Sequence, residues 1–237
     1  MKVIETNSYQ ETSDYAAKIV AEQIRNKKNS VLGLATGSSP EGMYQQLISF
    51  FQAGKLDFSE ITSVNLDEYY GLAPENKQSY RYFMNHHLFD HINISKENTF
   101  VPNGLTKDPE KECAEYDKRI EELGGIDLQV LGMGLNGHIG FNEPGDSFPV
   151  GTHLVTLDGS TIEANSRFFA SKEEVPTQAL SMGLKGIMGA KKILLIVHGK
   201  AKRETLEKAI SGPVTPWLPA SILQLHPDVT VVCSFNE

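Results

Sequence analysis

Short apolar runs, separated by longer amphipathic or polar stretches, recur along the 237-residue chain. Runs of this length are typical of strands that are buried on both faces of a parallel sheet. We predict strands over residues 31–35, 61–66, 126–131, 193–197 and 229–233. A further stretch, 152–157, is predicted to be extended.

The stretches between these strands carry helix signals. Apolar residues recur near helical spacing over 10–27, which predicts an amphipathic helix. Ser39 is suited to cap a helix and Pro40 to begin it, so a helix should run to about residue 51. Further helices are predicted over 78–91, 109–123, about 203–210 and 219–225.

Strands that alternate with helices at this spacing predict an α/β fold with a mostly parallel sheet and helices on both faces. The chain shows no internal repeat or clear linker, so we expect one domain over 1–237. The carboxyl ends of parallel strands meet at one edge of the sheet, where ligands bind in this fold class.

A glycine-rich polar loop, 131–145, follows the predicted strand 126–131 and is the strongest functional signal. Its glycines allow the backbone to turn sharply and to approach a ligand closely. His138 can exchange a proton near neutral pH, and Glu143 is close enough in sequence to orient it. Asn136 lies in the same loop. We therefore predict an active-site loop.

The same loop formally matches the G-x-G-x-x-G pattern of dinucleotide-binding proteins over 132–137. That pattern must open a helix whose N-terminus binds the pyrophosphate. Gly140, Pro144 and Gly145 follow within a few residues, and they disfavour a helix. We therefore do not expect a dinucleotide site.

Other polar groups follow other predicted strands. The segment 36–39 precedes a helix and could bind an anion through backbone N–H groups and hydroxyls, although it could equally be an ordinary helix cap. The acidic pair Asp67 and Glu68 follows the predicted strand 61–66 and is placed for acid–base work, although a solvated turn is the alternative. Lys200 and Lys202 begin a helix, where a bound anion would favour them, although both could point into solvent. We expect these segments to converge at one sheet edge.

Composition excludes several classes of function. The 22 Lys+Arg against 30 Asp+Glu give a net charge of −8, which argues against a nucleic-acid-binding surface. Two cysteines are too few for a disulfide framework. His87 and His91 are four residues apart, but no third metal ligand is evident. The chain has no apolar leader or membrane-length run, and we expect a cytoplasmic protein.

Several motifs together carry a resemblance that spans nearly the whole chain. They are ATGSSP at 35–40, NLDEY at 65–69, GLNGHIGFNEP at 134–144, NSRFF at 165–169 and LQLHP at 223–227. In this order they resemble the glucosamine-6-phosphate deaminase family, whose fold is a Rossmann-like α/β domain. The polar segment around 158–176 lies beside the site and is a lid candidate.

The resemblance implies conversion of glucosamine 6-phosphate and water to fructose 6-phosphate and ammonia, without a metal or organic cofactor. It implies that Asp67 moves the proton through a cis-enediolamine, that His138 assists ring opening and that Glu143 orients His138. The only partner implied is the small-molecule sugar phosphate. The positions tied to its phosphate group are Thr36, Gly37, Ser38, Ser39, Arg167 and Lys202.

Two departures from the long members of the family bear on regulation. Asn136 stands where they carry an Asp, so Glu143 is expected to be the only charged partner of His138. Their activator, N-acetylglucosamine 6-phosphate, binds between subunits of a hexamer, with help from a C-terminal extension. Asp146, His153 and Val155 stand where those members use a hydroxyl and two cations. We expect no such activation, and a monomer or small homo-oligomer.

Two alternatives share this fold class. A 6-phosphogluconolactonase-like hydrolase also has a G-x-G-x-x-G-H core, but a different segment follows its histidine. A lactonase also needs no acceptor for a C2 proton, so Asp67 favours the deaminase. A non-catalytic sugar-phosphate sensor would normally carry a DNA-binding module, and no helix-turn-helix precedes residue 31.

Overall fold

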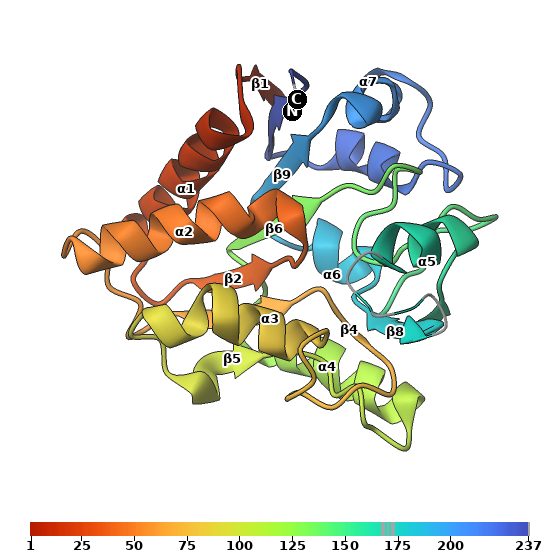
Figure 1. The fold of residues 1–237 in the computed structure, drawn as a ribbon, viewed down its shortest axis with the longest axis horizontal. Coiled ribbons are helices and arrows are strands. Elements are labelled where there is room, and N and C mark those ends of the chain that lie inside the picture. The colour runs from red at the N-terminus through yellow and green to blue at the C-terminus, as the bar shows by residue number, and fades with distance from the viewer. Residues whose placement is uncertain (167–168, 170, 172–173, 237) are drawn as a thin grey trace.

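The structure is a computed structural model that describes residues 1–166, 169, 171 and 174–236, apart from the side chains of 160, 164 and 165. Its centre is a seven-stranded sheet in the order β1-β10-β9-β6-β2-β3-β5, in which every pair of neighbours is parallel (Figure 1). The strands are β1 (Lys2–Glu5), β2 (Val31–Leu34), β3 (Thr62–Asn65), β5 (Thr99–Phe100), β6 (Leu128–Gly132), β9 (Ile193–His198) and β10 (Val229–Ser234).

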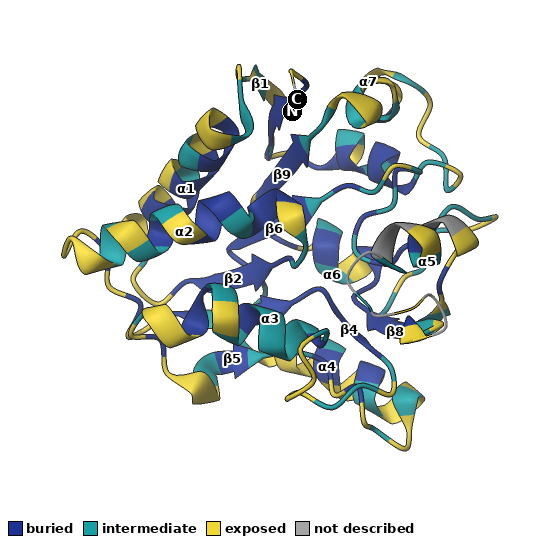
Figure 2. Ribbon diagram, viewed as in Figure 1, coloured by how far each residue is buried: buried dark blue, intermediate teal, exposed yellow. Residues whose placement is uncertain are grey.

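Helices cover both faces of this sheet, because successive strand residues point to opposite sides. In β9, Leu194 and Ile196 pack in a core beneath α1 (Tyr9–Asn26), α2 (Ser38–Gln52) and α3 (Tyr80–His87). Their neighbours Ile193, Leu195 and Val197 pack in a second core. That core lies beneath α4 (Pro109–Glu122), α6 (Leu184–Met188), α7 (Arg203–Ser211) and η6 (Pro219–Leu225). The central strands β2, β6 and β9 are accordingly buried in Figure 2, and the predicted α/β fold is confirmed.

A second sheet of three antiparallel strands, in the order β4-β8-β7, lies beyond the carboxyl end of β3. It consists of β4 (Asp67–Tyr69), β8 (Gln178–Ser181) and β7 (His153–Thr156), and α5 (Gly159–Asn165) follows β7. Only β7 was predicted to be extended. The chain passes from β3 through Leu66 directly into β4, so Asp67 stands where the two sheets meet.

Several predicted boundaries are wrong in detail. The cap of α2 is Gly37, at φ 88°, so Ser39 lies inside the helix. The predicted helix over 78–91 is α3 followed by a short 3₁₀ turn, η1 (Phe89–His91). Residues before α7 form another 3₁₀ turn, η5 (Lys200–Lys202), and 219–225 is also 3₁₀ rather than α. Within the described residues, no helix is long and apolar enough to cross a membrane.

Candidate active site

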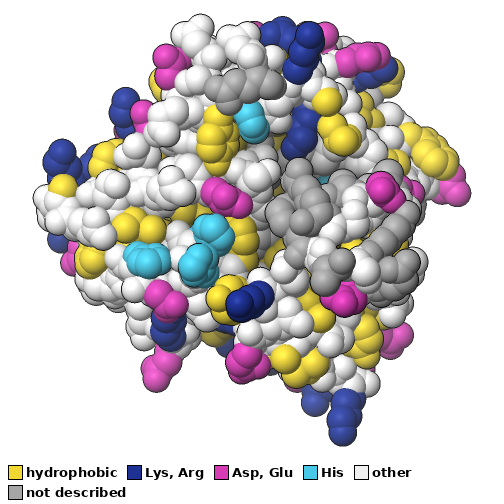
Figure 3. All heavy atoms as spheres, in the orientation of Figure 1, with side chains coloured by type: hydrophobic (Ala, Val, Ile, Leu, Met, Phe, Trp, Pro, Cys, Tyr) yellow, Lys and Arg dark blue, Asp and Glu magenta, His cyan; other side chains and the backbone are white. Residues whose placement is uncertain are grey.

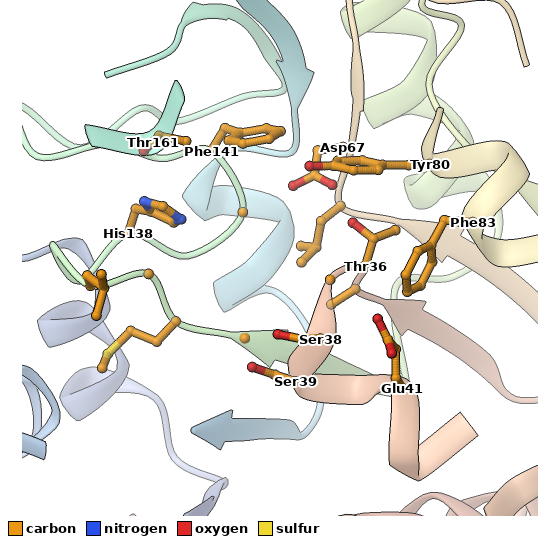
Figure 4. Close-up of a pocket in the computed structure, with 18 of the residues that line it drawn as sticks. Thr36, Ser38, Ser39, Glu41, Asp67, Tyr80, Phe83, His138, Phe141 and Thr161 are labelled. Atoms are coloured by element: carbon orange, nitrogen blue, oxygen red, sulfur yellow. The ribbon is translucent and has the colours of Figure 1, made fainter. Parts of the chain in front are cut away.

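The loops at the carboxyl edge of the parallel sheet surround a pocket of about 770 Å³. It is lined by the ends of β2, β6 and β9, by Asp67 of β4, and by α3 and α5, so the segments predicted to converge do so. In Figure 4, His138 faces the pocket from one side and Asp67 from another, with Ser38 and Ser39 at the far end. The predicted residues that line it are Thr36, Gly37, Ser38, Ser39, Asp67, Asn136, His138 and Lys202.

Glu143 lies behind His138 and fixes its orientation. The Glu143 Oε2 atom is 3.2 Å from His138 Nδ1, and its Oε1 accepts a hydrogen bond of 2.6 Å from the Thr161 hydroxyl. Burial disfavours the charged form of Glu143, but the hydrogen bonds outweigh it and lower the pKa to about 2. The ionised carboxylate of Glu143 accepts a hydrogen bond from Nδ1–H of His138. The other ring nitrogen, Nε2, then has no proton and can exchange one with a bound ligand.

Asn136 connects the two ends of this arrangement. Its amide group donates to Glu143 Oε2 at 2.8 Å, and its carbonyl oxygen accepts from the backbone N–H of His138 at 3.2 Å. Asn136 therefore holds Glu143 against the histidine without adding a charge, which agrees with the expectation that Glu143 is the charged partner of His138.

Glycines make this loop geometry feasible. Gly137 and Gly140 have positive φ angles of 84° and 57°. A Cβ on Gly134 would lie 2.3 Å from the ring of His138, so only glycine fits there. No helix begins within 132–145. The glycine pattern therefore forms a tight loop that leaves room for the ring of His138, and no helix follows it, as expected from Gly140, Pro144 and Gly145.

Asp67 is buried, at 6% exposure, and faces the pocket from a different direction than His138 (Figure 4). Burial, together with the nearby charge of Glu68, raises its pKa to about 8. The alternative of a solvated turn at 67–68 is wrong, because both carboxylates are buried strand residues. A carboxyl group with this pKa can both take up and return a proton near neutral pH.

Aromatic rings enclose Asp67. Tyr80 packs 4.8 Å from Tyr69 and stacks on Phe141 at 6.0 Å, with 13° between the planes. The hydroxyl end of Tyr80 lies beside the Asp67 carboxylate in Figure 4. Burial raises the pKa of Tyr80, so this hydroxyl stays protonated. No sequence motif marks Tyr80, which begins helix α3 at an otherwise ordinary position.

The other end of the pocket has features that suit an anion. The 15-residue helix α2 begins there, and its first backbone N–H groups have no partner within the helix. The Tyr9 hydroxyl donates to the Ser38 carbonyl at 2.7 Å and accepts from Gly42 N–H at 2.8 Å, which braces the first turn. Lys202 lines the pocket, and Lys200 is not among the described residues that do.

Two histidines that the sequence places four residues apart, His87 and His91, are not among the described residues that line the pocket. Arg167 is outside the described residues. His91 Nε2 is 2.8 Å from the His86 carbonyl, and the His87 ring stacks on Phe83 at 4.2 Å. Figure 3 shows histidine side chains gathered on the surface over the end of α3. Among the described residues, no group of three or more potential ligands could hold a metal ion.

Thr161 was not predicted as a site residue, although it belongs to the lid candidate. It lies on α5, and its hydroxyl reaches Glu143 across the pocket wall. Glu41, Phe83 and His198 also line the pocket and were missed, because nothing in the local sequence distinguishes them from surface or core residues.

Known proteins resemble this chain over its whole length. The family model for glucosamine-6-phosphate isomerases/6-phosphogluconolactonase matches residues 5–232. A glucosamine-6-phosphate deaminase of Lachnoclostridium phytofermentans is 61% identical over 236 residues, which covers 100% of both chains. Another, of Clostridium perfringens strain 13, is 56% identical over 232 residues, covering 98% of this chain and 96% of its own.

Solved structures show the same fold. That of a monomeric glucosamine-6-phosphate deaminase has a TM-score of 0.97 and 48% identity, covering 99% of this chain and 97% of its own. The structure of a 6-phosphogluconolactonase from Thermotoga maritima has a TM-score of 0.77 at 20% identity and covers 99% of both chains. At that identity the second likeness shows the fold alone.

Proposed function

The chain belongs to the family of glucosamine-6-phosphate isomerases and 6-phosphogluconolactonases, and within that family we propose that it converts glucosamine 6-phosphate and water to fructose 6-phosphate and ammonia. The deaminases of L. phytofermentans and C. perfringens, which share 61% and 56% of its residues, support this proposal. The chain is then an isomerising enzyme that hydrolyses a carbon–nitrogen bond in a sugar phosphate.

One observation about the site carries the chemistry. A buried carboxyl group with a pKa of about 8, Asp67, shares a pocket with the oriented pair His138 and Glu143. Lactone hydrolysis requires activation of one water molecule. Moving a hydrogen between neighbouring carbons of an opened sugar requires a separate base, and Asp67 supplies it.

The proposed steps begin with binding and ring opening. The phosphate group is held at the start of α2 and by Lys202, where backbone N–H groups and a cation face it. His138 then moves a proton between O1 and O5 through Nε2, which converts the cyclic sugar to the open aldehyde. Glu143 holds the tautomer of His138 that this step needs.

Asp67 next removes the proton from C2. The electrons of the C2–H bond form a C1–C2 double bond while a proton moves from the ammonium group of the substrate to the aldehyde oxygen, which gives the neutral cis-enediolamine. Asp67 returns its proton to C1, and C2 becomes an iminium carbon. Water adds to C2 and ammonia leaves. The aromatic rings around Asp67 limit access of bulk water to the proton during the transfer.

We also propose that the segment around 158–176 covers the pocket of the single domain when substrate binds. The contact of Thr161 on α5 with Glu143 supports this, because closure of that segment would then act on the catalytic pair. Arg167, in the same segment, would bring a forked cation to the phosphate.

Two parallel assays test the reaction. The purified chain should release ammonia from glucosamine 6-phosphate and form fructose 6-phosphate in equal amount. It should hydrolyse 6-phosphogluconolactone no faster than buffer does. Lactone hydrolysis without ammonia release would replace the deaminase with the lactonase. Binding of the sugar phosphate without turnover of either compound would favour the sensor.

Replacing Lys202 with Ala should raise KM for glucosamine 6-phosphate about 10- to 100-fold and change kcat little, because a charged contact of roughly 1.5–3 kcal/mol is lost. Steady-state ammonia release measures both constants. The matched control is Lys200→Ala, since Lys200 is in the same 3₁₀ turn but exposed and outside the pocket lining. Equal effects of the two substitutions would contradict the assignment, as would efficient turnover of free glucosamine by the parent.

We predict hyperbolic kinetics with a Hill coefficient of about 1 and no activation by N-acetylglucosamine 6-phosphate. Asp146 is exposed and would repel a second phosphate. Burial lowers the pKa of His153, whose Nδ1 is 3.1 Å from the Gly151 carbonyl, and Val155 packs against the apolar cluster around Tyr69. Initial rates with and without the activator test this.

A sigmoidal curve that becomes hyperbolic with N-acetylglucosamine 6-phosphate would contradict the absence of a second site. We propose that the protein is a monomer or small homo-oligomer. Light scattering tests this separately, by measuring its molar mass in solution. A similar structure is that of a monomeric deaminase.

A further inference from the structure

Glu68, the residue next to the proposed base, has an unusual position for a charged group. It is the middle residue of β4, where it pairs with Leu180 of β8, and only 2% of it is exposed. Successive side chains of a strand point to opposite faces, so Glu68 points away from the side of β4 that carries Asp67. A Cβ on Gly104 would lie 3.2 Å from Glu68 Cγ, so the chain closes over this side as well.

Four donors converge on the Glu68 carboxylate. Oε1 accepts from the backbone N–H groups of Tyr69 and Tyr80, at 2.8 and 2.9 Å. Oε2 accepts from the backbone N–H of Arg81 and from the hydroxyl of Ser79, both at 3.0 Å. The Ser79 hydroxyl has a second acceptor, the Pro74 carbonyl, at the longer distance of 3.4 Å.

This arrangement fits a carboxylate and not a carboxylic acid. Two carboxylate oxygens offer about four acceptor sites, and the four donors occupy them. Three of the donors are backbone N–H groups, which cannot reverse their role to accept a proton from Glu68. Burial raises the pKa of Glu68, and the four hydrogen bonds oppose that rise. The carboxylate also lies at the positive end of α3, which favours its charge.

The same hydrogen bonds determine where α3 begins. Ser79 is the cap of α3, and Tyr80 and Arg81 are its first two residues. The Arg81 guanidinium is directed to Thr99, with bonds of 2.7 and 2.8 Å to its hydroxyl and carbonyl. Tyr80 is thereby held with its ring against Tyr69 and its hydroxyl end beside Asp67 (Figure 4).

We propose that Glu68 is a positioning residue for the reaction: its buried carboxylate fixes the start of α3, which holds Tyr80 against Asp67, and its fixed negative charge keeps Asp67 a strong base. This inference rests on the proposed function, because it assigns the base to Asp67. A charge one residue away disfavours a second charge at Asp67, so Asp67 binds the C2 proton more tightly.

The other titratable groups near Asp67 do not provide this charge. They are tyrosines from three different helices: Tyr44 of α2, Tyr80 of α3 and Tyr116 of α4. Burial raises the pKa of each, so all three are neutral over the working range of pH. The Tyr44 and Tyr116 hydroxyls donate to backbone carbonyls, of Ala35 at 2.6 Å and of Asn65 at 2.7 Å. Of these four groups, Glu68 is the one whose charge raises the pKa of Asp67.

The test compares Glu68→Gln, which removes the charge but keeps the shape, with Ser79→Ala, which removes one donor but keeps the charge. The carboxyl carbon of Asp67 is followed by ¹³C NMR against pH without substrate, and its signal is identified by its loss in Asp67→Asn. In Glu68→Gln we expect the titration of Asp67 to move down by about one pH unit or more. The rise of kcat/KM with pH on the acidic side of its profile should move to lower pH by the same amount.

Ser79→Ala should lower thermal stability, because a helix cap is lost, but leave the Asp67 titration at the pH of the parent. A purely structural Glu68 would instead give a lower melting temperature in both variants and no shift of the Asp67 titration in either. That result would overturn the proposal. The titration needs no turnover, so failure of the proposed reaction would appear separately, in the ammonia assay.

Glu68→Asp decides the matter if Glu68→Gln does not fold. It retains the charge on a shorter side chain that cannot reach all four donors. Asp67 should then titrate within about half a pH unit of the parent, while kcat falls at least about tenfold because Tyr80 is misplaced. An Asp67 titration a full unit lower, or an unchanged kcat, would overturn the proposal.

Discussion

Asp67→Asn is expected to lower kcat by about 10²–10⁴, which is the usual contribution of a positioned acid–base group. The amide cannot accept the C2 proton, whereas the shape of the pocket and its anion-binding end are unchanged. KM should therefore change much less than kcat. Exchange of the C2 hydrogen with solvent should fall by the same factor as ammonia release, and both are measured on one sample by NMR.

The parent should show the pH dependence of this base. Asp67 must be ionised to act, and its pKa is raised to about 8, so kcat/KM should rise with pH until about pH 8. The ammonium group of the bound substrate favours the carboxylate, so the limb of kcat should lie at lower pH than that of kcat/KM. Asp146→Asn, at an exposed position, is the matched control and should keep the parent's profile.

The stability of Asp67→Asn against unfolding shows whether a loss of activity comes from lost chemistry or from lost folding. The pKa of Asp67 is higher in the folded chain than in the unfolded chain, so its protonated form contributes stability below about pH 4 that is lost as pH rises through about 8. Asn carries no such charge. Asp67→Asn should therefore be at least as stable as the parent above pH 8. A variant that retains near-full turnover would remove Asp67 from the mechanism.

The parallel sheet could be predicted because its central strands are apolar on both sides. Residues 193–197 contribute alternately to two cores, and this leaves an uninterrupted apolar run in the sequence. Strand β1 could not be found in this way, since it lies at an edge with three of its four residues exposed. The strand β5 has only two residues, too few to show any period.

The second sheet accounts for most of what the sequence did not reveal about the site. Asp67 and Glu68 look like a surface turn because two neighbouring carboxylates are rarely buried. They are buried because β8 pairs with β4, and that pairing joins residues more than a hundred positions apart. The donors that hold Glu68 are mostly backbone groups, which no side-chain motif records. The central loop was clearer, because its glycines, histidine and glutamate all lie within the 15 residues 131–145.

Replacing either His138 or Glu143 with Gln is expected to lower kcat by about 10²–10³. The kcat of the double variant should be no more than a few-fold below that of the less active single variant. Glu143 acts through His138, to which it is joined at 3.2 Å, so removing the histidine also removes the effect of the glutamate. Thr161→Val is the milder control. It removes the bond to the other oxygen of Glu143 and leaves the contact with His138 in place, so it should cost about tenfold or less.

The four rate constants form a double-mutant cycle, measured with saturating glucosamine 6-phosphate. Independent roles would make the loss in the double variant the product of the two single losses, and that outcome would separate Glu143 from His138 in the mechanism. The pH dependence adds a second criterion. Since the pKa of Glu143 is lowered to about 2, Glu143 stays ionised throughout the active range, and the limb assigned to Asp67 should persist in Glu143→Gln. Loss of that limb in Glu143→Gln would mean that Glu143, and not Asp67, is the group whose ionisation the parent's profile reports.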